Sequence, residues 1–299
     1  MGKFKPYSYA LFEGKIVPIK QAKISIMTNA LHYGTGAFGG IKIFKTDRGS
    51  AIFRLDDHLK RLKNSVKLLR FYYDFDFNKI KDSIIELARK NKVSSRAYIR
   101  PLIYRSDLNI SPDTKGEYHI AVYILDMPTY YDNNGLKVKV SPYVRNSNLS
   151  IPSNSKASGG YINSAMAIDE ARSSGYDSAI MLDKDGNVSE GAVMNLFIVK
   201  GGKLITPSLD SDILEGITRK TIIEIAGENG IKVEQRKVKK AELYGADELF
   251  FSGTATDITW CKKVDGTVIS QKSGPITLKL SDAYVNLPKT HPKYFTEIG

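Results

Sequence analysis

Apolar and polar positions follow two different periods in the first half of the chain. Runs in which they alternate between turn residues predict strands, whereas apolar residues every three or four positions predict helices. The predicted elements are, in order, hairpin strands 7–12 and 16–19, hairpin strands 41–44 and 51–54, helices from Asp56 and over about 78–92, and strands 97–104 and 119–125. This mixture predicts an α/β domain over residues 1–127.

Shorter strands and helices alternate in the second half. Residues 128–136 begin with the polar stretch PTYYDNNG and are predicted to connect two domains. The elements predicted after it are helices 162–174 and 216–229, the latter ended by Gly230, and strands 178–183, 194–200, 231–238 and 247–252. Residues 137–299 are therefore predicted to form a larger second domain, in agreement with roughly 100–200 residues per domain.

Composition narrows the class of protein. Apolar residues make up 42% of the chain, enough for buried cores, and the single cysteine, Cys261, indicates a reducing cytoplasm. No apolar run reaches the ~20 residues that span a bilayer, so no membrane contact is expected. The four histidines lack ligand spacing, so no metal is expected; His32 and His58 are predicted to make local hydrogen bonds.

The net charge of +12 raises the question of a nucleic-acid partner. The basic residues are spread out and alternate with apolar ones, and no nucleic-acid motif accompanies them, so no such partner is expected. The densest cluster, R236-K237-V238-K239-K240, is predicted to be a solvated surface. The alternative is that it steers anionic ligands inward.

Four segments of the second half carry the residue types that a pyridoxal phosphate enzyme needs. Lys156, in S-K-A-S-G-G, offers an amine for the Schiff base, and Glu190, in a predicted turn, offers a carboxylate for the ring nitrogen. G216-I217-T218-R219 opens a helix whose N–H groups suit a phosphate, and S252-G253-T254-A255-T256 follows a strand. Each alone has an ordinary structural interpretation; together, in this order, they predict pyridoxal phosphate chemistry.

Two segments of the first half resemble substrate-binding machinery. Tyr98 and Arg100 are two apart on a predicted strand, so they share a face where a phenol and a guanidinium could receive a carboxylate. Tyr33 and Phe38 lie in a glycine-rich stretch and could wall a pocket. The alternative interpretation of this stretch is a structured turn with core aromatics.

These segments resemble the branched-chain aminotransferases, which are fold-type-IV pyridoxal phosphate enzymes, over about residues 10–285. The resemblance is carried by A30-L31-H32-Y33-G34-T35, H58-L59-K60-R61-L62, AYIRPL (97–102) and the four segments above. It implies a small N-terminal α/β domain, a larger C-terminal pseudo-barrel domain, and a homodimer or higher oligomer. It also implies transamination of L-leucine, L-isoleucine and L-valine with 2-oxoglutarate.

The same resemblance implies the roles of single residues. Lys156 would be the catalytic base, Tyr98 would meet the substrate α-carboxylate, and Arg100 would meet the distal carboxylate of glutamate. The residues implied to hold the cofactor are Arg61, Lys156, Tyr161, Glu190, Leu214, Gly216, Ile217, Thr218, Gly253 and Thr254. Those implied to hold the substrate are Tyr33, Phe38, Tyr98, Arg100, Thr254 and Ala255.

Several positions depart from the pattern of that family. F38-G39-G40-I41-K42 replaces the usual F-E-G-I-R, and the loop after Tyr104, with Arg105, differs as well as the connection around Tyr130. These departures leave D-amino acids, (R)-amines or a reaction like that of aminodeoxychorismate lyase as alternatives. A basic binding protein with a vestigial site is a third, more distant hypothesis.

Overall fold

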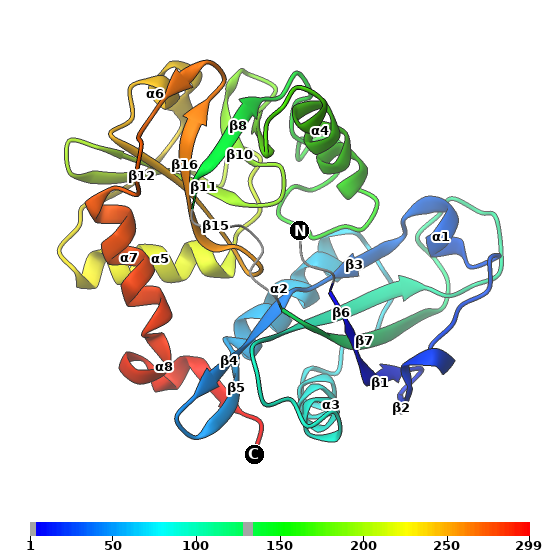
Figure 1. Cartoon of the computed structure of the whole chain (residues 1–299). Coiled ribbons are helices and arrows are strands. Elements are labelled where there is room, and N and C mark those ends of the chain that lie inside the picture. The colour runs from blue at the N-terminus through cyan, green and yellow to red at the C-terminus, as the bar shows by residue number, and fades with distance from the viewer. Residues whose placement is uncertain (1–3, 128–133) are drawn as a thin grey trace. The chain divides into compact units, whose positions relative to one another are not determined.

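The computed structural model describes residues 4–127 and 134–299. Internal contacts divide the chain into two compact units (Figure 1). The first contains the described residues up to Met127 together with Ser155–Gly160 and Leu287–Gly299, and the second contains the other described residues. The sequence predicted one connection at 128–136, of which residues 128–133 lie outside the described residues. Residues 155–160 and 287–299 join the first unit, although they follow that connection in the chain.

An eight-stranded antiparallel sheet forms the centre of the first unit. Its strand order is β18-β5-β4-β6-β7-β1-β2, and β3 also pairs with β6. The bounds are β1 Pro6–Phe12, β2 Lys15–Pro18, β3 Gly36–Phe38, β4 Ile41–Thr46, β5 Gly49–Phe53, β6 Ala97–Arg105, β7 Tyr118–Asp126 and β18 Phe295–Glu297. Both predicted hairpins are confirmed, with Leu11 opposite Ile16 and Ile43 opposite Ile52.

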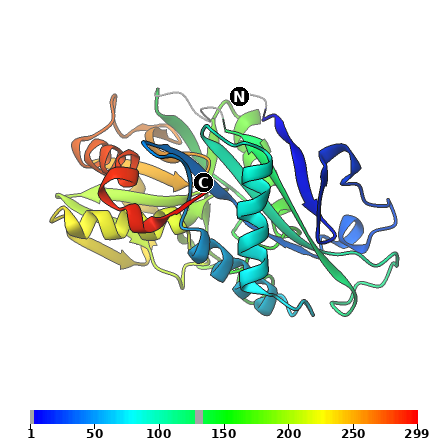
Figure 2. The same cartoon turned by 90° about the horizontal axis from the view of Figure 1, so that it is seen from below.

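Helices α2 (Leu55–Leu68) and α3 (Phe77–Lys90) pack against this sheet (Figures 1 and 2). Leu59 and Ile84 are buried in the same core as Ile43 of β4, as the helical period predicted. The remaining elements of this unit are short: η1 Ile19–Gln21, α1 Asn29–Tyr33, α8 Leu287–Thr290 and η2 Pro292–Tyr294. Burial of this apolar face fixes the rotation of α2 about its own axis, and with it the positions of the polar residues of the helix.

A ten-stranded sheet forms the second unit, with the order β13-β12-β11-β15-β16-β8-β9-β10-β14 and β17 beside β16. The bounds are β8 Leu136–Val140, β9 Ser178–Leu182, β10 Asn187–Gly191, β11 Asn195–Lys200, β12 Lys203–Pro207, β13 Val233–Arg236, β14 Val238–Lys239, β15 Glu248–Gly253, β16 Asp257–Val264 and β17 Thr267–Val268. Gly191 and Met194 form a bridge where β10 turns into β11, so the sheet curls back on itself around an apolar core. This curled sheet is the pseudo-barrel that the resemblance implied.

Four helices complete the second unit: α4 Tyr161–Ser173, α5 Ile217–Glu228, α6 Lys240–Tyr244 and α7 Pro275–Val285. The Glu248 carboxylate of β15 accepts the N–H groups of Ile276 and Thr277 at 3.0 and 2.7 Å, which caps α7. Over the residues that the structure describes, no helix combines the length and apolar character needed to cross a membrane.

The basic cluster after β13 makes contacts within its own unit. Arg236 pairs with Glu242 at 2.6 Å, and the Lys239 Nζ donates to Asn187 at 2.9 Å. Lys237 lies 4.0 Å from Asp185. These partners fit the predicted solvated surface, because Arg236 and Lys237 lie near carboxylates and Lys239 donates to a side-chain amide of the same unit.

Candidate active site

The segment that carries Lys156 runs beside strand β3 in the first unit. Phe38 N donates to Lys156 O at 3.1 Å, and Ala37 and Ala157 form a bridge. The close approach requires glycine at position 34, where φ is +63° and an added Cβ would lie 2.6 Å from the Cα of Gly159. The glycine-rich stretch therefore provides the surface on which the Lys156 segment packs.

Helix α2 contacts the same segment from the other side. Ser65 Oγ accepts the Lys156 N–H at 3.0 Å. Arg61 and His58 precede Ser65 by about one and two turns, so the three lie on one face of the helix. The structure thus brings Lys156 and the helix of Arg61 together, as the resemblance implied.

His58 is a buried histidine among cations. Its Nδ1 has no hydrogen-bond partner within the described part of the chain, so this nitrogen does not make the predicted local hydrogen bond. Burial lowers the pKa of His58 well below its usual value, and the charges of Arg61, Lys156 and Arg54 lower it further. His32, in contrast, does contact the Ile26 carbonyl oxygen at 2.9 Å. An unpartnered ring nitrogen beside cationic groups fits a site for an anion such as a phosphate ester.

Tyr98 and Arg100 lie together on β6, as predicted. Arg100 Nη2 donates to the Tyr98 hydroxyl at 3.0 Å, and its guanidinium lies 4.5 Å from the centre of the Phe38 ring. The Lys156 Nζ lies 5.0 Å from the same ring centre. Gly40 makes room for this cluster, because an added Cβ would be 2.0 Å from the Tyr98 hydroxyl oxygen. The first unit therefore holds an amine, a guanidinium, a phenol and an apolar ring in one cluster.

Tyr33 and Arg105 organise a neighbouring loop. Tyr33 donates its hydroxyl to Ile110 O at 2.6 Å, so its described polar contact is with this loop. Arg105 is buried, and its guanidinium binds Asp107 at 2.6 Å and Asp113 at 3.0 Å. The Arg105 side chain thus holds its own loop, and these contacts give no support to its being a substrate-binding arginine.

Glu190 lies in strand β10 of the second unit, not in the predicted turn. The turn comes earlier, because Asp183 accepts the N–H groups of Asp185 and Asn187 and closes the hairpin there. The pairing of β10 with β9 shifts register between Val188 and Gly191. This irregularity falls at Glu190, whose carboxylate is buried.

The Glu190 carboxylate is held by residues that the sequence analysis missed. Arg145 donates from Nε at 3.0 Å and from Nη2 at 2.9 Å to one carboxylate oxygen, and Asn195 Nδ2 donates to the other at 2.7 Å. Asn195 also donates to Leu214 O at 2.9 Å. No local sequence pattern marks Arg145 or Asn195, because each acts through a partner in another element.

Helix α5 begins at Ile217, three residues after Leu214, whose carbonyl oxygen belongs to this network. Gly216 is its N-cap, and no described side chain caps the helix, which leaves the N–H groups of Ile217 and Thr218 for an anion. Glycine is required at position 216, since an added Cβ would lie 1.9 Å from Asn195 Oδ1. Arg219, the third residue of α5, is buried and donates from Nη2 to Pro207 O at 2.9 Å.

The loop after β15 offers further donors in the second unit. The hydroxyls of Ser252 and Thr256 are buried and have no hydrogen-bond partner among the described residues. An added Cβ at Gly253 would come within 2.9 Å of Thr256 Oγ1, so Thr254 and Ala255 sit in a tight turn. Tyr161, at the start of α4, belongs to the same unit. Unpartnered hydroxyls and an uncapped helix N-terminus both fit a phosphorylated cofactor.

We expect the apoprotein to lose stability through His58 as the pH falls. Unfolded chains bind a proton there below about pH 6.5, whereas the native chain does not, because the pKa of His58 is lowered. The free energy of unfolding should therefore fall by up to about 1.4 kcal/mol per pH unit below that value. Urea titrations should find this slope reduced in His58→Gln, and equal slopes in the two proteins would contradict the prediction.

The chain is similar to known aminotransferases over nearly its whole length. The family described as amino-transferase class IV matches residues 36–264. A probable branched-chain-amino-acid aminotransferase of Synechocystis is 42% identical over 98% of this chain and 96% of its own length. A branched-chain aminotransferase of Thermoproteus uzoniensis, solved with norvaline, aligns with a TM-score of 0.92 at 36% identity, over 98% and 100% of the two chains. A branched-chain amino acid aminotransferase of T.th., complexed with N-(5'-phosphopyridoxyl)-L-glutamate, aligns at 0.93 and 33%, over 98% and 99%.

Proposed function

The chain belongs to the amino-transferase class IV family and is a pyridoxal phosphate-dependent aminotransferase, and we propose that its substrates are L-leucine, L-isoleucine and L-valine with 2-oxoglutarate. The products are the branched 2-oxo acids and L-glutamate. The observation that carries this choice is the cluster of Phe38, Tyr98 and Arg100 beside Lys156. An apolar ring suits a branched side chain, and the guanidinium suits the distal carboxylate of glutamate.

The proposed roles follow from the contacts of each unit. Bound pyridoxal phosphate supplies an aldehyde that accepts the amino group and a ring that withdraws electrons from the substrate α-carbon. Lys156 would hold the cofactor, and its Nζ would take the proton from the substrate α-carbon and deliver it to the carbon that bore the cofactor aldehyde. Glu190, kept in place by Arg145, would partner the ring nitrogen.

The remaining assignments concern the phosphate, the ring and the substrate carboxylate. Arg61 would bind the phosphate, supported by the unpartnered Nδ1 of nearby His58, and the uncapped N-terminus of α5 is proposed for the same group. The other proposed cofactor contacts are Tyr161, Leu214, Gly216, Ile217, Thr218, Gly253 and Thr254. The proposed substrate contacts are Tyr33, Phe38, Tyr98, Arg100, Thr254 and Ala255.

A panel of single amino donors tests the substrate assignment. The purified enzyme is mixed with L-leucine, L-valine, D-alanine or an (R)-arylalkylamine, and conversion of the cofactor to its aminated form is followed by absorbance. Only the L-branched donors should convert it, and 2-oxoglutarate should then restore the starting spectrum. Conversion by D-alanine or the amine without conversion by L-leucine would overturn the proposal.

Arg100→Leu should separate the two substrates of the same pocket. Loss of a charge-assisted contact of about 2–3 kcal/mol predicts a fall in kcat/KM for 2-oxoglutarate of roughly 30- to 150-fold. The value for L-leucine should change by only a few-fold, because its side chain carries no charge to pair. Equal losses for both substrates would remove Arg100 from this role.

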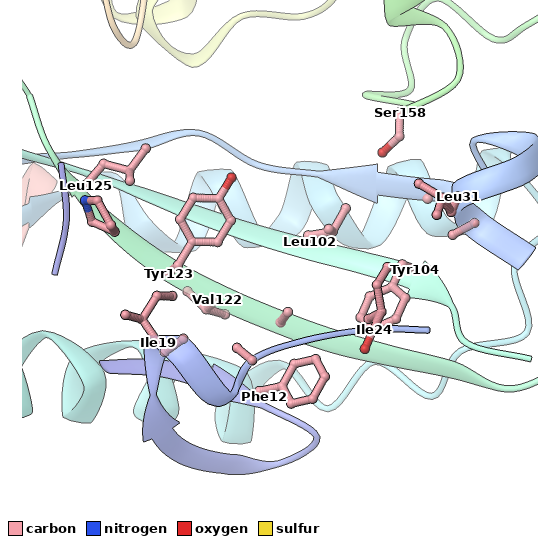
Figure 3. Close-up of a pocket in the computed structure, with 16 residues that line it drawn as sticks. Phe12, Ile19, Ile24, Leu31, Leu102, Tyr104, Val122, Tyr123, Leu125 and Ser158 are labelled. Carbon is pink, nitrogen blue, oxygen red and sulfur yellow. The ribbon is translucent and has the colours of Figure 1, made fainter. Parts of the chain in front are cut away.

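A homo-oligomer is the second part of the proposal. Two segments of the first unit, residues 24–33 and 108–110, expose large apolar side chains and are joined by the Tyr33–Ile110 hydrogen bond. Beside them lies a cavity of about 560 Å³ with apolar walls (Figure 3). The exposed apolar side chains of the two segments include Ile24, Ile26, Met27, Leu31, Leu108 and Ile110. Apolar surface of this kind suits a second copy of the chain.

Solution mass tests this assembly. The wild-type chain should sediment as a dimer or higher oligomer, and Ile26→Glu and Ile110→Glu should shift it toward monomer. Leu149→Glu, at an exposed apolar residue of the second unit, is the matched control and should leave the mass unchanged. A monomeric wild type would remove the oligomer from the proposal, and dimeric glutamate variants would remove this surface.

A cytoplasmic location is also proposed, supported by the single cysteine, whose thiol is buried.

A further inference from the structure

One buried hydroxyl joins the backbone of Lys156 to the turn of α2 that carries Arg61. Ser65 is fully buried, and its Oγ accepts the Lys156 N–H at 3.0 Å while donating to Arg61 O at 3.0 Å. A serine hydroxyl has one proton to donate and two lone pairs to accept, so both bonds form at once. The result is a continuous chain from the Lys156 amide through Ser65 to the Arg61 carbonyl.

The other edge of the Lys156 segment is occupied by β3. Lys156 O accepts the Phe38 N–H at 3.1 Å, and Ser158 N donates to Gly36 O at 2.8 Å. The segment is thus held along β3 by backbone bonds and toward α2 by the Ser65 hydroxyl. Ser65 is 91 residues from Lys156 in sequence, so this second contact depends on the fold and not on local geometry.

We infer that Ser65 is a positioning residue that sets the spacing between Lys156 and Arg61, and thereby the fit of a ligand bound by both. The inference rests on the proposed roles of Lys156 at the aldehyde and Arg61 at the phosphate. Pyridoxal phosphate carries these two groups on neighbouring carbons of a rigid ring, so their separation varies little. A protein that grips both must hold its own two groups at a matching separation.

A plainer role would be to satisfy a buried N–H and nothing more. The two roles differ in which ligands are affected when the hydroxyl is removed. If Ser65 sets a spacing, ligands that use only one of the two groups bind as before, and only the ligand that uses both is weakened. If Ser65 merely supports the segment, every ligand that reacts with Lys156 is weakened alike.

Binding of three ligands to the apoenzyme tests the inference. The ligands are pyridoxal phosphate, 5′-deoxypyridoxal, which keeps the aldehyde but has no phosphate, and inorganic phosphate. The proteins are the wild type, Ser65→Ala and the control Ser178→Ala, which removes a buried hydroxyl with no hydrogen-bond partner among the described residues. Dissociation constants are taken from absorbance for the aldehydes and from thermal shift for phosphate.

Ser65→Ala should weaken pyridoxal phosphate roughly tenfold, the cost of one unmade buried hydrogen bond. It should change the constants for 5′-deoxypyridoxal and phosphate by less than about twofold, within the scatter of neutral substitutions. Ser178→Ala should change none of the three. Equal weakening of both aldehydes, or no weakening of either, would overturn the inference.

A measurement on the wild type distinguishes failure of the positioning role of Ser65 from failure of the proposed function. Borohydride reduction of the wild-type complex, followed by peptide mapping, should place the pyridoxyl group on Lys156. If the label falls elsewhere, the proposed roles fail before Ser65 is considered. If it falls on Lys156 while Ser65→Ala binds all three ligands like the wild type, only the positioning role is lost.

Discussion

Lys156→Ala should abolish covalent retention of the cofactor and lower transamination by at least roughly 10³-fold, within the range for loss of a positioned acid–base group. The Lys156 Nζ lies in the cluster with Phe38, Tyr98 and Arg100, and it is the amine proposed to hold the cofactor. Its backbone bonds to Phe38 and Ser65 do not involve the side chain, so the segment should keep its place.

Turnover and borohydride trapping measure this effect together. The matched control is Lys63→Ala, which removes an exposed lysine from the outer face of α2. The control should retain wild-type turnover and the pyridoxyl label, whereas Lys156→Ala should lose both and still unfold cooperatively in urea. Full turnover in Lys156→Ala would refute the assignment of the base.

Arg145→Met should remove about 3–5 kcal/mol from the free energy of unfolding, the usual cost of leaving one member of a buried ion pair unpaired. Only 10% of the Arg145 side chain and 5% of the Glu190 side chain are exposed, so water cannot replace the lost partner. Asn195 at 2.7 Å and Leu214 N at 3.3 Å also donate to Glu190, and neither donor carries a positive charge.

Urea unfolding of the apoprotein measures the loss. Arg145→Met combined with Glu190→Gln should recover part of it, because the second change removes the uncompensated charge. Arg236→Met is the control, since the Arg236–Glu242 pair is 39% and 34% exposed and should contribute no more than about 1 kcal/mol. A loss at Arg145 as small as that at Arg236 would show that solvent already screens the Glu190 pair.

Periodic segments were the part of the fold that could be predicted from sequence. The stripe of Leu59, Leu62 and Val66 predicted α2, and all three are buried in the core of the first unit. Such segments are predictable because burial of one face imposes a period that any window of the sequence displays. Helix α7 and strand β18 were not predicted. The first depends on a cap from Glu248, 28 residues before Ile276, and the second on the edge of β5.

The candidate site divides in the same way. Lys156, Glu190 and the glycine turns could be recognised because each lies in a short motif of characteristic residue types. The position of Glu190 in a strand could not, since it follows from the pairing of β10 with β9. Arg145 and Ser65 carry no motif at all and become visible only through their bonds to Glu190 and Lys156.

The sequence by itself determined the reaction class, the family resemblance and the main strands and helices, because each is encoded in side-chain chemistry or in a local period. Tertiary structure alone decided which residues hold the reactive groups in place. Ser65 meets Lys156 across 91 residues, and Arg145 meets Glu190 across 45. Hydrogen bonds at such separations depend on how the sheets and helices pack, and packing is a property of the whole chain rather than of any segment within it.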